Sequence, residues 1–211
     1  MNTIRNSIRF KPDTKLRKRW FTDEAMSHPA KLHLGLLWQI GEMYTRPGDL
    51  VLDPMAGIGS SLMLAMMGRN VICSELEARF VEIARASWEK IQRNGPMLGH
   101  KMGEAHIFQA DSRHLTQALA EHLDTPVDAV ITSPPYEGTA VGHSEEDLKR
   151  QQERLVTLVE SGANVSSRTR SYARSRRWNG NLAERGYTLS QDAENIGNMK
   201  GQAYWDAMRD V

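Results

Sequence analysis

Two short polar loops carry residue types that could bind and activate a ligand, and each follows an apolar run. The first loop is Asp53-Pro54-Met55-Ala56-Gly57-Ile58-Gly59-Ser60, and the second is Thr132-Ser133-Pro134-Pro135-Tyr136. Runs as apolar as 49–53 and 127–131 are typical of buried parallel strands. Both loops are therefore expected at the carboxyl ends of sheet strands, where open α/β folds bind their ligands.

The glycines of the first loop permit a tight turn and a close approach of the backbone to a ligand. Gly57 and Gly59 lack Cβ atoms, and a helix beginning near Ser60 would direct free N–H groups towards a carboxylate. A dinucleotide fingerprint requires a third glycine three residues after Gly59, but Leu62 stands there. The alternative of a dinucleotide oxidoreductase is therefore not favoured.

Three acidic residues end three successive predicted strands, and together they form a candidate binding constellation. Asp53 ends the first strand, Glu75 follows the second and Asp111 follows the third. Each also has a structural alternative. Asp53-Pro54 could start a turn, Glu75 could be surface charge, and Asp111-Ser112 could cap the following helix.

The two prolines of the second loop favour recognition of a nucleobase amine. They remove two backbone donors and stiffen the loop, which leaves carbonyl groups facing outward. The Ser133 hydroxyl and the Pro134 carbonyl could accept hydrogen bonds from the amine, while Tyr136 stacks on the base. Positioning and electrostatics would then promote the reaction, and no general base is required. The structural alternative is a rigid surface turn.

The spacing of apolar residues predicts alternating strands and helices. Strands are expected at 49–53, 70–74, 105–109 and 127–131, and helices from Pro29 to Tyr44 and over 61–67, 79–91 and 115–123. This alternation predicts an α/β fold with a doubly wound, mostly parallel sheet. Three regions are expected: a solvated basic arm (1–27), a core (28–136), and a polar, arginine-rich region with a partial helix (137–211).

Composition excludes several classes of protein. The 211 residues carry a net charge of only +1, so any nucleic-acid contact must come from a local patch. A single cysteine, Cys73, and the lack of an apolar spanning run or metal-ligand spacing predict a cytoplasmic protein without a metal site or a membrane partner. A candidate nucleic-acid-binding patch lies in the C-terminal region, where arginines alternate with aromatic residues. The alternative interpretation of this stretch is a solvated charged run. The arginines of the patch are Arg168, Arg170, Arg174, Arg176 and Arg177.

Over residues 28–136 the chain resembles the amino-group DNA methyltransferases. The resemblance rests on His28-Pro29-Ala30-Lys31, Pro47-Gly48-Asp49, the Asp53–Ser60 loop, Glu75 and Thr132–Tyr136. It is closest to the N4-cytosine branch, in which a Ser-Pro-Pro-Tyr loop is typical. The implied fold is a Rossmann-like methyltransferase fold and the implied cofactor is S-adenosylmethionine.

The resemblance implies a role for each candidate residue. Asp53 would accept from the cofactor's ammonium group, Glu75 from the ribose hydroxyls and Asp111 from the adenine amino group. The remaining cofactor-binding candidates form the glycine loop, enclose the methionine end or adjoin Asp111: His28, Pro29, Lys31, Pro54, Ala56, Gly57, Gly59, Ser60 and Ser112. The catalytic candidates are Ser133, Pro134, Pro135 and Tyr136.

The chain departs from the family pattern at three places. Met55 replaces the usual Phe, Ser60 replaces the commoner Thr, and residues 137–211 contain no clear apolar run for three further strands. The sheet is therefore expected to lack its last strands, and the chain to be C-terminally incomplete, with a complementing chain or a homo-oligomer as partner.

Three functions follow from these observations. The first is site-specific methylation of double-stranded DNA at an exocyclic amine, cytosine N4 before adenine N6, with the target base flipped. Its setting would be a bacterial or phage restriction-modification or related system. The alternatives are an RNA base-amino methyltransferase and a non-catalytic fragment that requires a partner chain.

Overall fold

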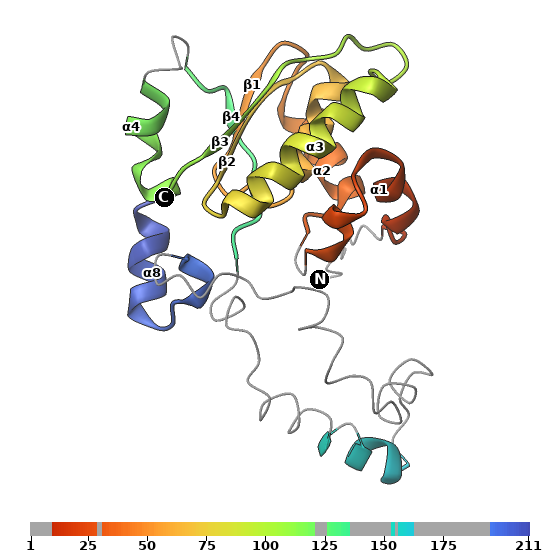
Figure 1. The fold of residues 1–211 in the computed structure, drawn as a ribbon, viewed down its shortest axis with the longest axis vertical. Coiled ribbons are helices and arrows are strands. Elements are labelled where there is room, and N and C mark those ends of the chain that lie inside the picture. The colour runs from red at the N-terminus through yellow and green to blue at the C-terminus, as the bar shows by residue number, and fades with distance from the viewer. Residues whose placement is uncertain (1–9, 29–30, 121–125, 136–152, 155, 163–194) are drawn as a thin grey trace, which may run out of the picture. The chain divides into compact units, whose positions relative to one another are not determined.

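The computed structural model describes residues 10–28, 31–120, 126–135, 153–154, 156–162 and 195–211. Its central feature is a four-stranded, all-parallel sheet with the strand order β3-β2-β1-β4 (Figure 1). The strands are β1 (Leu50–Asp53), β2 (Asn70–Glu75), β3 (Ala105–Gln109) and β4 (Ala129–Val130). The four predicted strands are thus confirmed, although β4 is shorter than expected.

The strand order places a topological switch point between β1 and β4. From β1 the chain adds β2 and then β3 on one side, and it then crosses to place β4 on the other side of β1. A crevice forms at such a point beyond the carboxyl ends of the strands, and open α/β folds bind ligands there. The Asp53 loop leaves β1 and the Ser133 loop follows β4, so the fold brings both predicted loops to this point.

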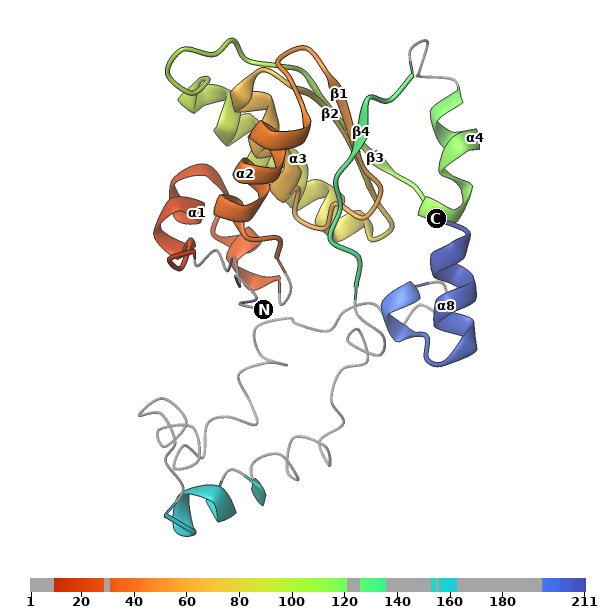
Figure 2. The same ribbon diagram turned by 180° about the vertical axis from the view of Figure 1, so that it is seen from behind.

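Helical segments cover both faces of the sheet, which confirms the doubly wound arrangement. On one face, Leu115 and Leu119 of α4 (Leu115–Ala120) form an apolar cluster with Ile72. On the opposite face, the Ser61 hydroxyl of η2 (Ser60–Met67) lies 3.3 Å from the Cys73 sulfur. Two longer helices are α2 (Leu34–Tyr44) and α3 (Ala78–Asn94). Figures 1 and 2 show α4 on one side of the sheet and α2 and α3 on the other.

Two predicted helices differ from the structure in their start or type. The helix expected from Pro29 begins at Leu34, because the His33 imidazole accepts the N–H groups of Gly35 and Leu36 and caps it; Pro29 itself lies outside the described residues. The segment after the glycine loop is a 3₁₀ helix, η2, with left-handed glycines at both ends. All eight of its side chains are buried, so its methionines fill the core as expected.

The N-terminal segment differs from the expected solvated arm. Residues Thr14–Trp20 form α1, and Glu24–Ser27 form a 3₁₀ turn, η1. Phe21 and Ala25 are fully buried, and Arg17 is 1% exposed, whereas Lys15, Lys18 and Arg19 are exposed as predicted. Arg17 therefore belongs to the core, where its guanidinium group donates a hydrogen bond to Ser60.

The chain divides into two compact units, residues 1–134 with 206–211 and residues 135–205. In the second unit the described residues include η4 (Ile196–Asn198) and the start of α8 (Gln202–Arg209). The short helix expected at 204–208 is thus confirmed within α8. Of the helices that the structure describes, none has the length and apolar character to cross a membrane.

Candidate functional site

The glycine loop turns back over the end of β2, and backbone hydrogen bonds fix that turn. The Ala56 N–H donates to the Ser74 carbonyl at 2.9 Å, and Gly57 and Gly59 adopt φ values of 54° and 78°. A Cβ atom at Gly59 would lie 2.5 Å from the Leu62 Cδ1 atom. Glycine is therefore required at Gly59 for both its conformation and its space.

Asp53 presents a buried carboxyl group where the two loops meet. Its side chain accepts the Met55 N–H at 3.2 Å, and the residue is 3% exposed. Burial raises the pKa of Asp53, while the hydroxyls of Ser61 and Thr132 lower it. Among the described residues the buried Thr132 hydroxyl has no hydrogen-bond partner, although it is one of the groups that lower the pKa of Asp53. Because Ser133 follows Thr132, the candidate catalytic loop adjoins Asp53.

Glu75 joins the end of β2 to the glycine loop. One carboxylate oxygen accepts the Gly57 N–H at 2.8 Å, and the other accepts the Glu77 N–H at 2.9 Å. Burial raises the pKa of Glu75 to about 7, with smaller contributions from the charges of Glu77 and Asp53, although the two backbone donors oppose the rise. A carboxylate can accept about four hydrogen bonds, so each oxygen can still accept one more, as a pair of hydroxyls would require.

The raised pKa of Glu75 predicts a pH-dependent loss of stability. The folded-state value of about 7 lies above the ordinary value of 4.5, so the folded protein binds more protons between these limits. The free energy of unfolding should therefore fall as pH rises through this window. Glu75→Gln removes this contribution, so we expect the variant to gain stability relative to the wild type between about pH 5 and pH 8.

Denaturant unfolding of both proteins at several pH values measures this difference. Glu82→Gln is the matched control, because Glu82 is an exposed glutamate of α3. The control should follow the wild type at every pH. A constant difference between Glu75→Gln and the wild type across the whole range would contradict the predicted role of burial.

The third strand end also reaches the site, but its carboxylate is already engaged. The Ser112 hydroxyl donates to the Pro54 carbonyl and so joins the end of β3 to the first loop. Asp111 accepts the Arg113 N–H at 3.0 Å and forms an ion pair with the Arg113 guanidinium, which lowers its pKa. Asp111 thus begins the short 3₁₀ helix η3 (Ser112–His114), as the capping alternative expects. Its contact with an adenine amino group stays a prediction.

Of the predicted residues near the N-terminus, His28 packs against the glycine loop. The His28 imidazole lies 3.5 Å from the position that a Cβ at Gly57 would occupy, and its ring packs edge-on against Phe80 with 4.5 Å between the centroids. Lys31 donates to the carbonyls of Met26 and His28. Burial lowers the pKa of Lys31, and the Arg17 charge lowers it further. The structure thus places His28 against the glycine loop, whereas a role of Lys31 at that loop stays a prediction.

The candidate catalytic loop is described as far as Pro135. Ser133 is exposed and Pro134 is partly buried. In the second unit, the Tyr204 hydroxyl donates to the Pro135 carbonyl at 2.9 Å, and Tyr204 is 7% exposed. Tyr136 and the five patch arginines lie outside the described residues, so their roles stay predictions.

Three side chains near the site were not predicted as functional. Ser61 follows the first predicted loop and Thr132 begins the second, so their hydroxyls could have been found from sequence position alone. Arg17 donates to the Ser60 hydroxyl at 3.0 Å. The four-residue spacing of Asp13, Arg17 and Phe21 places them on one helix face, and this spacing could have indicated that Arg17 is paired and buried.

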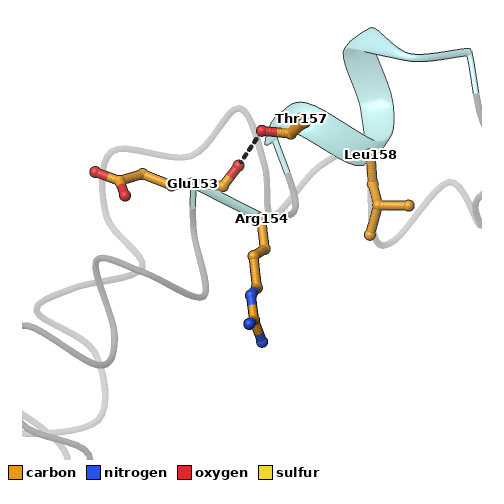
Figure 3. Close-up of a pocket in the computed structure, with 4 residues that line it drawn as sticks. All are labelled: Glu153, Arg154, Thr157 and Leu158. Atoms are coloured by element: carbon orange, nitrogen blue, oxygen red, sulfur yellow. Dashed lines mark hydrogen bonds between the residues drawn. The ribbon is translucent and has the colours of Figure 1, made fainter.

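The second unit contains a hollow that none of the predicted site residues lines. Figure 3 shows its four lining residues, which are Glu153, Arg154, Thr157 and Leu158. The Thr157 hydroxyl donates to the Glu153 carbonyl at 2.9 Å, which closes one helical turn. The arrangement offers no set of groups suited to catalysis, and we assign it no role.

Comparison with known proteins identifies related sequences. Residues 6–86 match the family model of the N6/N4 methyltransferases, described as DNA methylase. The tRNA (guanine(10)-N2)-dimethyltransferase of Methanothermobacter thermautotrophicus is 32% identical over 109 residues, which cover 50% of this chain and 28% of that protein. The chain thus spans less than a third of this relative's length. The solved tRNA m1G37 methyltransferase of M. jannaschii is 17% identical, with a TM-score of 0.34, over 48% of this chain and 27% of that one.

Proposed function

We propose that the protein transfers a methyl group from S-adenosylmethionine to an exocyclic amine of a nucleic-acid base. The match of residues 6–86 to the family model of the N6/N4 DNA methylases supports this proposal. The observation that carries this proposal is the meeting of the two loops at Asp53. Strands β1 and β4 are paired, and the Ile131 N–H donates to the Leu52 carbonyl at 2.9 Å, so Asp53 and Thr132 end neighbouring strands at the same edge of the sheet, and Thr132 precedes the candidate catalytic residue Ser133. A ligand bound at the glycine loop would therefore adjoin a base held by Ser133 and Pro134.

The charges at the glycine loop fit a cationic cofactor. Asp53 and Glu75 are two enclosed carboxyl groups, and among the described residues neither forms an ion pair with a basic side chain. Each raised pKa reflects a negative charge that burial disfavours. S-Adenosylmethionine carries an ammonium and a sulfonium group, so its binding would compensate these charges, and when bound it supplies an electrophilic methyl group. Asp53 would hold the ammonium and Glu75 the ribose hydroxyls.

The second loop supplies acceptors for the amine. The lone pair of a nucleobase amine is delocalised into the ring, so the amine is a poor nucleophile. The Ser133 hydroxyl and the Pro134 carbonyl would accept its N–H groups and leave the lone pair available. Transfer would form the nitrogen–carbon bond as the bond between the cofactor's sulfur and its methyl group breaks, so that the neutral thioether S-adenosylhomocysteine leaves, and the methylated amine would then release one proton to water. Fixed dipoles suffice for this step because no strong base is needed.

For the substrate we propose cytosine N4 in double-stranded DNA, with the target base flipped towards Ser133. The family match to DNA methylases and the Ser-Pro-Pro-Tyr loop support this choice. A second candidate is a guanine amine in transfer RNA, because the archaeal relative that matches half of this chain is a tRNA guanine N2 methyltransferase.

Transfer of a labelled methyl group to defined acceptors tests the proposed substrate class. The protein is incubated with labelled S-adenosylmethionine and either duplex DNA of mixed sequence or unmodified transfer RNA. We expect incorporation into DNA. Incorporation into transfer RNA alone would contradict the DNA assignment in favour of the second candidate. No incorporation into either acceptor, by protein that binds the cofactor, would contradict the proposed activity of this chain.

A further inference from the structure

Arg17 is a buried cation of α1 that donates a hydrogen bond to Ser60, the last residue of the glycine loop. One guanidinium nitrogen donates to the Ser60 hydroxyl at 3.0 Å, and another donates to Asp13 at 2.8 Å and to the Leu32 carbonyl at 2.7 Å. The residue is 1% exposed, and Ser60 is 4% exposed. A buried charge is tolerated only when it is paired and hydrogen-bonded, so this geometry is closely determined by its partners.

The same ion pair also fixes the start of α2. Asp13 accepts the Leu34 N–H at 3.0 Å while it pairs with Arg17. Asp13 and Arg17 thus join three segments that are distant in sequence: α1, residues 32–34 and the first residue of η2. We call this group the Arg17 latch (Asp13, Arg17, Leu32, Leu34 and Ser60).

The latch makes the Ser60 end of the loop more positive than the Asp53 end. Arg17 and Lys31 are near enough for the Arg17 charge to lower the pKa of Lys31, and Asp13 offsets only one of the two positive charges. The Arg17 Nε atom is buried and has no hydrogen-bond partner among the described residues. At the other end lie the carboxyl groups of Asp53 and Glu75. An amino acid zwitterion would match this polarity, with its carboxylate towards Ser60 and its ammonium towards Asp53.

We infer that Arg17 is a positioning residue for the amino-acid end of S-adenosylmethionine. This inference rests on the proposed function. Arg17 holds Ser60, and with it the N-terminus of η2, in the orientation that receives the carboxylate, and it adds a positive charge behind that position. It does not act on the adenosine end, which Glu75 would bind on the next strand.

The affinities for two ligands separate this role from a general structural one. S-Adenosylmethionine has the amino-acid end, whereas 5′-methylthioadenosine has the same adenosine without it. Arg17→Lys keeps the charge but cannot reproduce the forked contacts to Ser60, Asp13 and Leu32. Ser60→Ala removes the contact at the loop and leaves the buried Asp13–Arg17 pair intact. Calorimetry gives both dissociation constants, and circular dichroism monitors the folding of each variant.

We expect each variant to weaken S-adenosylmethionine binding by about tenfold while leaving 5′-methylthioadenosine within about twofold of the wild type. If Arg17→Lys does not fold, Ser60→Ala alone gives the answer. Equal weakening of both ligands, or of neither, would overturn the inference while leaving the proposed function in place. Wild-type protein that binds neither ligand would overturn the proposed function, and the inference with it.

Discussion

Replacing Asp53 with asparagine is expected to reduce strongly the rise in melting temperature that S-adenosylmethionine should give the wild-type protein. Under the proposed function the buried Asp53 carboxylate would offer a negative charge to the cofactor's ammonium group, and a neutral amide of the same shape could not. Hydrogen bonds to charged groups contribute about 1.5–3 kcal/mol, so the dissociation constant should rise roughly 10- to 100-fold, which calorimetry measures.

The substitution should not destabilise the unliganded protein. Burial raises the pKa of Asp53, so the ionised group opposes folding, and asparagine can still accept the Met55 N–H. Asp49→Asn is the matched control, because Asp49 immediately precedes β1 at its opposite end. The control should bind the cofactor as the wild type does. Wild-type affinity in Asp53→Asn would remove the basis for the cofactor site.

Pro135→Ala and Tyr136→Ala are expected to reduce methyl transfer about 100-fold while retaining most of the cofactor affinity. Pro135 would stiffen the loop that is proposed to position the amine, and Tyr136 would stack on the base; neither is expected to contact the cofactor. Pro135→Ala keeps the carbonyl that accepts from Tyr204, so it tests the stiffness of the loop rather than that contact.

Tyr136→Phe is the control for the aromatic residue, because phenylalanine retains the stacking surface. It should keep transfer within a few-fold of the wild type if stacking is the role. Single-turnover rates and calorimetry on the same preparations separate transfer from cofactor binding. Unchanged transfer in both alanine variants would exclude the second loop from catalysis. Loss of cofactor affinity in parallel with transfer would assign it to binding instead.

The sequence was sufficient to predict the sheet and the residues at its carboxyl edge. Val51 and Val71 belong to short apolar runs that are typical of buried parallel strands, and these strands end at Asp53 and Glu75. Once strand identity is known, the parallel arrangement brings these two carboxyl groups to the same edge. The prediction succeeded because each step depends on residues close together in the chain.

The contacts that involve Arg17 and Asp111 could not be predicted in the same way. Arg17 is buried because Ser60, 43 residues later, and Leu32 complete its hydrogen bonds; next to Lys18 and Arg19 it has the composition of a solvated run. Asp111 follows its strand as expected, but Arg113 two residues later occupies its carboxylate. Such pairings depend on the packed structure, and the charge pattern alone does not distinguish them.

The identity of the methylated nucleoside tests the central proposal most directly. Duplex DNA is incubated with the protein and S-adenosylmethionine, digested to nucleosides and examined by mass spectrometry against authentic standards. The proposal predicts N4-methylcytosine, whereas N6-methyladenine would retain the amino-group mechanism and contradict the choice of cytosine. Methylation at cytosine C5 requires a cysteine nucleophile, and the single cysteine, Cys73, is fully buried with its pKa raised, mainly by that burial. Detection of 5-methylcytosine would therefore contradict the proposed transfer of the methyl group to an exocyclic amine.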